Sequence, residues 1–122
     1  MVEIPTRIKE IISKYIRALN ENNVNVDRAV LFGSYAKGNY SEWSDIDLAV
    51  VSNAFEGSWI KDRRKIRAIT LSISSDIQVL PYRPEDFILD DPFVREIIET
   101  GVPLSGNVEM GSGKANFPVS MP

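Results

Sequence analysis

Residues 31–50 read LFGSYAKGNYSEWSDIDLAV, and this stretch determines most of what can be predicted about the chain. It begins in an apolar segment, passes through Gly33-Ser34 and a polar loop, and enters a second apolar segment at Asp45. A short run of Ile, Leu, Ala and Val is typical of a buried strand. The two carboxylates at the start of that run, Asp45 and Asp47, therefore require an explanation.

The residues on both sides of this stretch predict alternating helices and strands. From Thr6 to Leu19 apolar residues recur at helical spacing, and Thr6 is a suitable N-cap. Three short apolar runs, at 27–32, 45–51 and 76–82, are typical of buried strands. The order of these elements indicates an α/β (α+β) fold, in which helices pack against a small sheet.

Two further helices complete the predicted pattern. Residues 58–73 have helical composition, and a short helical turn is expected within 85–91. The last helix is predicted to begin after Asp91 as its cap, with Pro92 in the first helical position, and to stop at Gly101. Each boundary is placed by a residue that is favoured at helix ends.

The composition predicts one globular domain. The chain has 122 residues, of which 43% are hydrophobic and 25% charged, which is enough for a single core. We expect this domain to span residues 1–104 and a Gly-, Ser- and Pro-containing tail without a catalytic role to span 105–122. Because the sequence contains neither a run of about 20 apolar residues nor a signal-peptide pattern, we expect a cytoplasmic protein without a membrane partner.

Two missing residue types limit the chemistry. The sequence contains no cysteine and no histidine, which excludes disulfides, thiolate nucleophiles, Cys-based zinc sites and the commonest general base. Catalysis must therefore use carboxylates, hydroxyls, Lys, Arg and hard cations. The net charge of −3 argues against broad binding of nucleic acid as a direct partner.

Asp45 and Asp47 are expected to project from the same side of one strand. Residues two apart on a strand share a side, with α-carbons roughly 6.5 to 7 Å apart. Because no Lys or Arg occurs between Lys37 and Lys61, a bound divalent cation is one way to balance the two charges. Asp76 opens the next predicted strand and would bring a third carboxylate to the same rim if the two strands are neighbours, a ligand set suited to Mg²⁺ or Mn²⁺.

Gly33 and Ser34 are suited to holding a phosphate. Gly allows a tight turn after a strand, and Ser offers a hydroxyl and an N–H at the start of a short predicted helix, SYAKG. Lys37, one helical turn later, could reach the same anion. Each feature also has a simpler explanation: an ordinary turn for Gly33-Ser34, a solvated strand end for the paired aspartates, and a strand boundary for Asp76.

Together these features resemble the nucleotidyltransferase superfamily that includes DNA polymerase β. The resemblance rests on Gly33-Ser34, on the Asp-x-Asp of SDIDLAV after ten intervening residues, and on DIQVL from Asp76 onward. The whole segment is more closely similar to the minimal nucleotidyltransferases, single-domain proteins often paired with a HEPN-domain protein. The resemblance covers residues 6–104 and implies a polymerase-β-like fold, a small mixed β-sheet flanked by helices that lie on one side of it.

The resemblance also implies a role for six residues. They are Gly33, Ser34 and Lys37 for nucleotide binding, and Asp45, Asp47 and Asp76 for catalysis and for ligating two Mg²⁺ ions, or Mn²⁺. Asp76 would in addition help to deprotonate the acceptor hydroxyl. The family often has Arg at the position of Lys37, so this chain keeps the charge there but not the bidentate fork.

The function implied by the resemblance is transfer of AMP from ATP to a hydroxyl of a partner protein. The partner would be a HEPN toxin, the acceptor a tyrosine, and the chain the antitoxin of a type VII-like toxin–antitoxin pair. Two alternatives stay open: neutralisation of the toxin by binding without catalysis, and nucleotidyl transfer to RNA or a small molecule. The sequence also leaves open a homo- or hetero-oligomer.

One basic helix face is a further candidate for binding a partner. Lys61, Arg64 and Lys65 fall on one face of the predicted helix, with Arg63 and Arg67 adjacent. This face could meet an acidic or a nucleic-acid surface, or it could simply be solvated.

Overall fold

The computed structural model describes residues 3–104, and its elements follow the predicted alternation. The predicted tail, 105–122, lies outside the described residues. The helices are α1 (Thr6–Glu21), α2 (Ser34–Lys37), α3 (Trp59–Ile73) and α4 (Pro92–Thr100), with a 3₁₀ turn, η1 (Pro84–Asp86). The strands are β1 (Arg28–Phe32), β2 (Ile46–Val51), β3 (Ile77–Tyr82) and β4 (Val102–Leu104).

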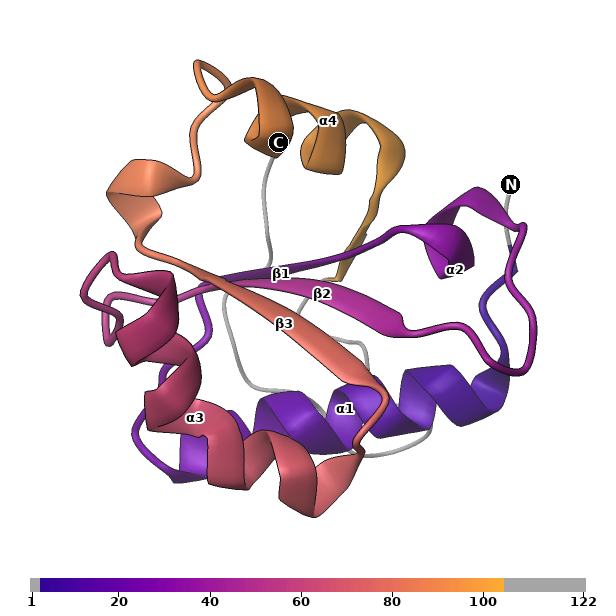
Figure 1. The fold of residues 1–122 in the computed structure, drawn as a ribbon, viewed down its shortest axis with the longest axis horizontal. Coiled ribbons are helices and arrows are strands. Elements are labelled where there is room, and N and C mark those ends of the chain that lie inside the picture. The colour runs from indigo at the N-terminus through magenta and orange to yellow at the C-terminus, as the bar shows by residue number, and fades with distance from the viewer. Residues whose placement is uncertain (1–2, 105–122) are drawn as a thin grey trace.

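The four strands form one mixed sheet in the order β3-β2-β1-β4. β1 is antiparallel to both β2 and β4, whereas β2 and β3 run parallel. The parallel pair needs a crossover connection, and α3 provides it. The prediction of a small mixed sheet flanked by helices is thus confirmed (Figure 1).

Helices cover both faces of this sheet, so the expectation that they lie on one side was wrong. Along β2, Ile46, Leu48 and Val50 point into the larger core with α1 and α3, and Ala49 and Val51 point into a smaller core with α4. Figure 1 shows α1 and α3 below the sheet and α4 above it. The chain must cross from β3 at one edge to β4 at the other, and α1 and α3 already occupy the first face.

The boundaries of α1 and α4 are close to the predicted ones. α1 begins at Thr6, but its N-cap is Pro5, so Thr6 is the first helical residue instead of the cap. α4 is capped as predicted: the Asp91 carboxylate accepts hydrogen bonds from the N–H groups of Phe93 and Val94 at 2.9 and 3.3 Å. These bonds satisfy two of the N–H groups that a helix start leaves without partners.

The strand β4 was not predicted from the sequence. It has only three residues and contains Pro103, which cannot donate a backbone hydrogen bond, so it forms at an edge of the sheet. Gly101, just before it, has an ordinary negative φ of −86°. A side chain there would approach the carbonyl oxygens of Ile97 and Leu31 and the side chain of Val30 to within 3 Å, so close packing against the end of α4 and against β1 is the reason for glycine.

Two buried polar side chains of α3, Asp62 and Thr70, hold this helix in place. Asp62 is fully buried, and its carboxylate accepts hydrogen bonds from the N–H groups of Glu56 and Gly57 at 2.8 and 3.0 Å. The Tyr15 hydroxyl of α1 hydrogen-bonds that of Thr70 of α3 at 2.7 Å. Each group therefore joins α3 to a different part of the chain.

Candidate active site

The residues predicted to form the site gather at one end of the sheet. β1 ends there, and β2 and β3 begin there, since Phe32 pairs with Asp47 and Ile46 pairs with Ile77. The short helix α2 follows β1 at the same end (Figure 1). Antiparallel pairing of β1 with β2 and parallel pairing of β2 with β3 thus bring three separate segments to one rim.

Gly33 and Asp47 are in direct contact at this rim. Gly33 precedes α2 with a φ of +76°, a conformation that favours glycine. A side chain at position 33 would collide with the carboxylate of Asp47. The turn after β1 is therefore fitted closely to this carboxylate.

Asp45 and Asp47 lie close enough to interact electrostatically. Asp45 is exposed and Asp47 is half-buried. Burial, and then the charge of Asp45, raises the pKa of the Asp47 carboxyl above its ordinary value. Two carboxylates in such a position suit a divalent cation, because hard oxygen ligands bind Mg²⁺ or Mn²⁺ and the ion would offset their repulsion.

Asp76 reaches the same rim with its backbone. Its carbonyl oxygen accepts a hydrogen bond from the N–H of Ile46 at 2.9 Å, and its side chain is exposed. Within residues 3–104, however, no three acidic side chains lie close enough together to hold one metal ion. The structure therefore brings Asp45 and Asp47 together and leaves the Asp76 side chain outside a three-carboxylate cluster.

Sequence reasoning missed Gln78. It pairs in register with Asp47, and paired residues of parallel neighbours project from the same face of a sheet. The signal was available, because Gln78 follows Asp76 by two residues on a predicted strand. Gln78 thus projects from the same face of the sheet as Asp47, on the neighbouring strand.

The short helix α2 forms as predicted. Ser34 is its first residue and Lys37 its last, and Gly38 ends it with a φ of +82°. Buried Tyr35 stacks on Tyr40 with ring centroids 4.6 Å apart, which fixes the start of the loop to β2. Ser34 therefore lies at the N-terminus of α2, directly after Gly33. The exposed Lys37 lies one helical turn further along.

A family model described as "Nucleotidyltransferase domain" matches residues 12–109 of this chain. The chain belongs to this nucleotidyltransferase family and is a nucleotidyltransferase enzyme, as the resemblance predicted. The match spans every element that forms the rim.

Two relatives from Methanocaldococcus jannaschii carry a more specific name. "Putative protein adenylyltransferase MJ0141" is 34% identical over 83 residues, which are 66% of this chain and 76% of that protein. "Putative protein adenylyltransferase MJ1215" is 47% identical over 45 residues, which are 37% of this chain and 51% of that protein.

Solved structures share the fold. A crystal structure of a "putative nucleotidyltransferase" from Sulfolobus solfataricus matches with a TM-score of 0.58 and 17% identity, covering 81% of this chain and 80% of that one. A chain from "the toxin-antitoxin with AMP-PNP" matches with a TM-score of 0.52 and 22% identity, covering 74% of this chain and 68% of that one.

None of the helices within residues 3–104 is both long and apolar enough to cross a membrane.

Proposed function

We propose that this chain transfers AMP from ATP to a hydroxyl of a partner protein, a tyrosine of a HEPN-domain toxin, and thereby acts as an antitoxin. The observation that carries the chemical part is the fit of the Gly33 turn to the Asp47 carboxylate, with Asp45 beside it. The names of the two relatives support protein adenylylation, and the toxin–antitoxin structure supports the partner class.

The residues at the rim would divide the reaction among themselves. The backbone of Gly33 and Ser34 would hold the triphosphate, and Lys37 would add a positive charge. Asp45 and Asp47 would hold Mg²⁺, or Mn²⁺, which supplies neutralisation of the triphosphate charge and polarisation of the α-phosphate. Asp76 would complete this ligand set once it turns toward the other two carboxylates.

The bond changes follow from this arrangement. The acceptor oxygen forms a bond to the α-phosphorus in line with the leaving group. The bond between the α-phosphorus and the oxygen that bridges it to the β-phosphorus breaks, and pyrophosphate leaves with that oxygen. The acceptor proton passes to the Asp76 carboxylate. Orientation and charge neutralisation supply most of the rate enhancement in such a transfer, so histidine is not needed.

The exposure of the rim suits a macromolecular acceptor. Asp45 and Asp76 are both exposed, whereas only Asp47 is partly covered. A tyrosine on the surface of another protein could therefore approach the rim directly.

Intact-mass spectrometry tests the proposal. A HEPN-domain protein encoded beside this chain is incubated with the chain, ATP and Mg²⁺, and we expect its mass to increase by one or more AMP units. Asp47→Asn should lower the transfer rate at least about 1,000-fold, because one of the two paired carboxylates is lost. Asp90→Asn, an exposed aspartate outside the rim, is the matched control and should leave the rate unchanged. Transfer that survives in Asp47→Asn would contradict the proposal.

Neutralisation by binding alone is the second candidate, and the lack of a three-carboxylate cluster within residues 3–104 favours it. Its signature is a stable complex with the toxin and no added mass. AMP transfer to RNA or to a small molecule in the absence of any protein would instead assign a different acceptor to the same site.

A further inference from the structure

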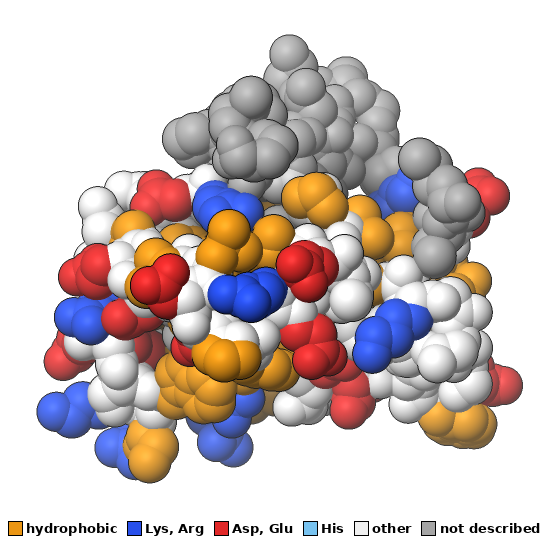
Figure 2. Space-filling view, turned by 90° about the horizontal axis from the view of Figure 1, so that it is seen from above, with side chains coloured by type: hydrophobic (Ala, Val, Ile, Leu, Met, Phe, Trp, Pro, Cys, Tyr) orange, Lys and Arg blue, Asp and Glu red, His pale blue; other side chains and the backbone are white. Residues whose placement is uncertain are grey.

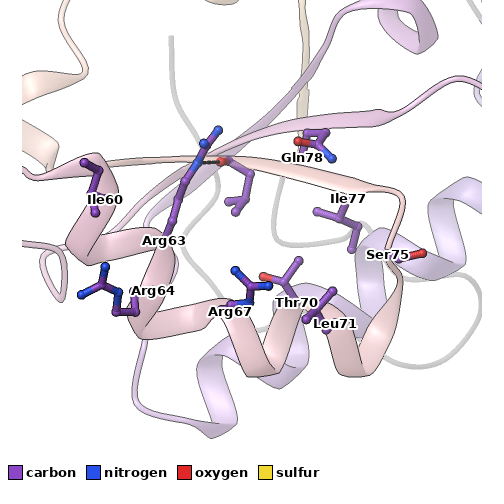
Figure 3. Close-up of a pocket in the computed structure, with 10 residues that line it drawn as sticks. Ile60, Arg63, Arg64, Arg67, Thr70, Leu71, Ser75, Ile77 and Gln78 are labelled. Carbon is purple, nitrogen blue, oxygen red and sulfur yellow. Dashed lines mark hydrogen bonds between the residues drawn. The ribbon is translucent and has the colours of Figure 1, made fainter.

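We propose that the groove between α3 and β3 binds an acidic amphipathic helix of a partner protein. The groove has a volume of about 500 Å³. Figure 3 shows its lining residues, with α3 below and the edge strand β3 above. The arginines Arg63, Arg64 and Arg67 line it together with aliphatic side chains.

One side of the groove is a continuous stripe along α3. Ile60, Arg64, Arg67 and Leu71 are spaced by four, three and four residues, which is the spacing of a seam that packs against another helix. Ile60 is 71% exposed and Leu71 is 55% exposed. Large aliphatic side chains at both ends of a stripe, with two arginines between them, match a helix that has apolar ends and an acidic centre.

The charge of the groove is of one sign. Within residues 3–104, no Asp or Glu lines the groove, and neither Arg64 nor Arg67 forms an ion pair there. The α4 side of the molecule differs, since acidic and basic side chains are interspersed there (Figure 2). Guanidinium groups bind carboxylates in a bidentate manner, so the groove favours Glu and Asp of a partner.

Lys65 was predicted to share this basic face but does not. Its ammonium group donates a hydrogen bond to the carbonyl oxygen of Ala54 at 2.9 Å, on the other side of α3 from the groove lining. The groove is therefore built from arginines, which differ from lysines in their planar fork.

The free edge of β3 is protected against pairing with another strand. The Arg63 side chain donates a hydrogen bond to the carbonyl oxygen of Val79 at 3.1 Å, shown as a dashed line in Figure 3. Pro81 further along the same strand has no N–H to donate. An occupant must therefore be recognised through side chains, which suits a helix better than a strand.

The lining also distinguishes a protein from a nucleic acid. Apolar contact comes from aliphatic residues, and among the described residues, 3–104, no aromatic side chain lines the groove. Proteins that bind single-stranded nucleic acid usually stack its bases on aromatic side chains. Ile60, Leu71 and Ile77 instead offer the surface that Leu, Ile or Val of a partner helix would cover.

One end of the groove leads to the candidate active site. Ser75 and Gln78 line that end, and they flank Asp76 along the chain. Gln78 is also the register partner of Asp47. A protein docked in the groove would thus extend to the rim, and we infer that it is the protein that carries the acceptor, a point that rests on the proposed function.

A designed peptide tests the groove without reference to catalysis. The probe is a fluorescein-labelled, helix-stabilised peptide with Leu opposite Ile60 and Leu71 and Glu opposite Arg64 and Arg67. We expect Arg64→Glu/Arg67→Glu to weaken its binding at least about 30-fold in fluorescence anisotropy, because two opposite-charge contacts become repulsive. Arg7→Glu/Lys14→Glu makes the same charge change on exposed positions of α1 and should change affinity less than about threefold.

Three results would overturn the groove assignment. They are failure of the peptide to bind the wild-type chain, equal binding by both double variants, and preferential binding of a 12-nucleotide RNA that is lost in Arg64→Glu/Arg67→Glu. Circular dichroism and thermal unfolding establish that each variant is folded. Arg64→Ala/Arg67→Ala, which only removes the charges, should fall between the wild type and the reversed variant.

The HEPN-domain protein tests the link to catalysis. Arg64→Glu/Arg67→Glu should lose AMP transfer to that protein while retaining binding of ATP. Transfer at the wild-type rate in this variant would overturn the inference that the groove holds the acceptor protein. Absence of transfer by the wild-type chain, combined with arginine-dependent binding of the peptide, would contradict the proposed function and leave the groove assignment in place.

Discussion

The two faces of the sheet use the same strands for different purposes. On the α1 and α3 side, alternate residues of β2 and β3 are apolar and buried. They are Ile46, Leu48 and Val50 of β2, and Ile77 and Val79 of β3. On the α4 side, Ala49 and Val51 are buried, but the start of the same strand carries Asp47, which is only half-buried. One strand thus supplies a core with one set of side chains and a charged rim with the other.

This difference separates stability from chemistry. The face packed against α1 and α3 excludes water along the whole of β2, and its apolar contacts stabilise the fold. At the open end of the other face, burial and Asp45 raise the pKa of the Asp47 carboxyl, so the charged form is disfavoured there. Substitutions on the two faces should therefore have separable effects on activity and on the free energy of unfolding.

Gly33→Ala should lower both the AMP-transfer rate and the free energy of unfolding, and we expect its combined effect on the two to be the largest. The methyl group would collide with the Asp47 carboxylate, and φ of +76° is unfavourable for alanine. We expect the AMP-transfer rate to fall at least about 100-fold and the unfolding free energy to fall by about 1–3 kcal/mol in urea titrations. Gly57→Ala, with φ of +95° at the other end of β2, is the control and should lower stability while activity persists.

Asp62→Ala should affect stability alone. It would leave the N–H groups of Glu56 and Gly57 without their carboxylate acceptor in a buried place. We expect the unfolding free energy to fall by about 2–4 kcal/mol, with an unchanged transfer rate per folded molecule. A large loss of activity in the folded fraction would mean that the two ends of the sheet are coupled. Asp90→Ala, at an exposed position, should change stability by less than about 0.5 kcal/mol.

Tyr15→Phe, in the core between α1 and α3, should produce a smaller loss of unfolding free energy. The substitution removes the hydrogen bond to Thr70, whose hydroxyl keeps its bond to the carbonyl oxygen of Ile66. We expect a loss of about 1–1.5 kcal/mol in chemical denaturation and no change in activity. Tyr40→Phe, a more exposed tyrosine, should have little effect on stability.

The smallest expected effect is a loss of stability that is absent near neutral pH and appears only in alkaline solution. Burial raises the pKa values of Tyr15 and Tyr82 to about 12. A raised folded-state pKa contributes stability that is fully present below pH 10 and is lost as the pH rises toward 12. The wild type should therefore lose urea resistance between pH 10 and 11.5 faster than Tyr15→Phe/Tyr82→Phe. Parallel curves for the two proteins would contradict this prediction.

Local sequence patterns were sufficient for most of the secondary structure. Strands β1, β2 and β3 begin within one residue of their predicted starts, and Asp91 with Pro92 marked the start of α4 correctly. These features depend on neighbours along the chain, such as apolar alternation and helix capping. The family and its site candidates could also be read from the spacing of Gly33-Ser34 and the aspartates.

Other features depended on which segments meet in space. The strand β4 is too short to carry a pattern and exists because β1 offers it a free edge. The placement of α4 on the second face followed from α1 and α3 already covering the first.

The sequence by itself determined the elements and the residues that could carry the chemistry, because periodicity, capping and spacing are properties of neighbours along the chain. Only the tertiary structure decided that Gly33 touches Asp47, that the Asp76 side chain stays outside the carboxylate pair, and that arginines of α3 face a groove while Lys65 does not. Those outcomes depend on strand register and on side-chain directions across elements distant in sequence, which no local pattern specifies.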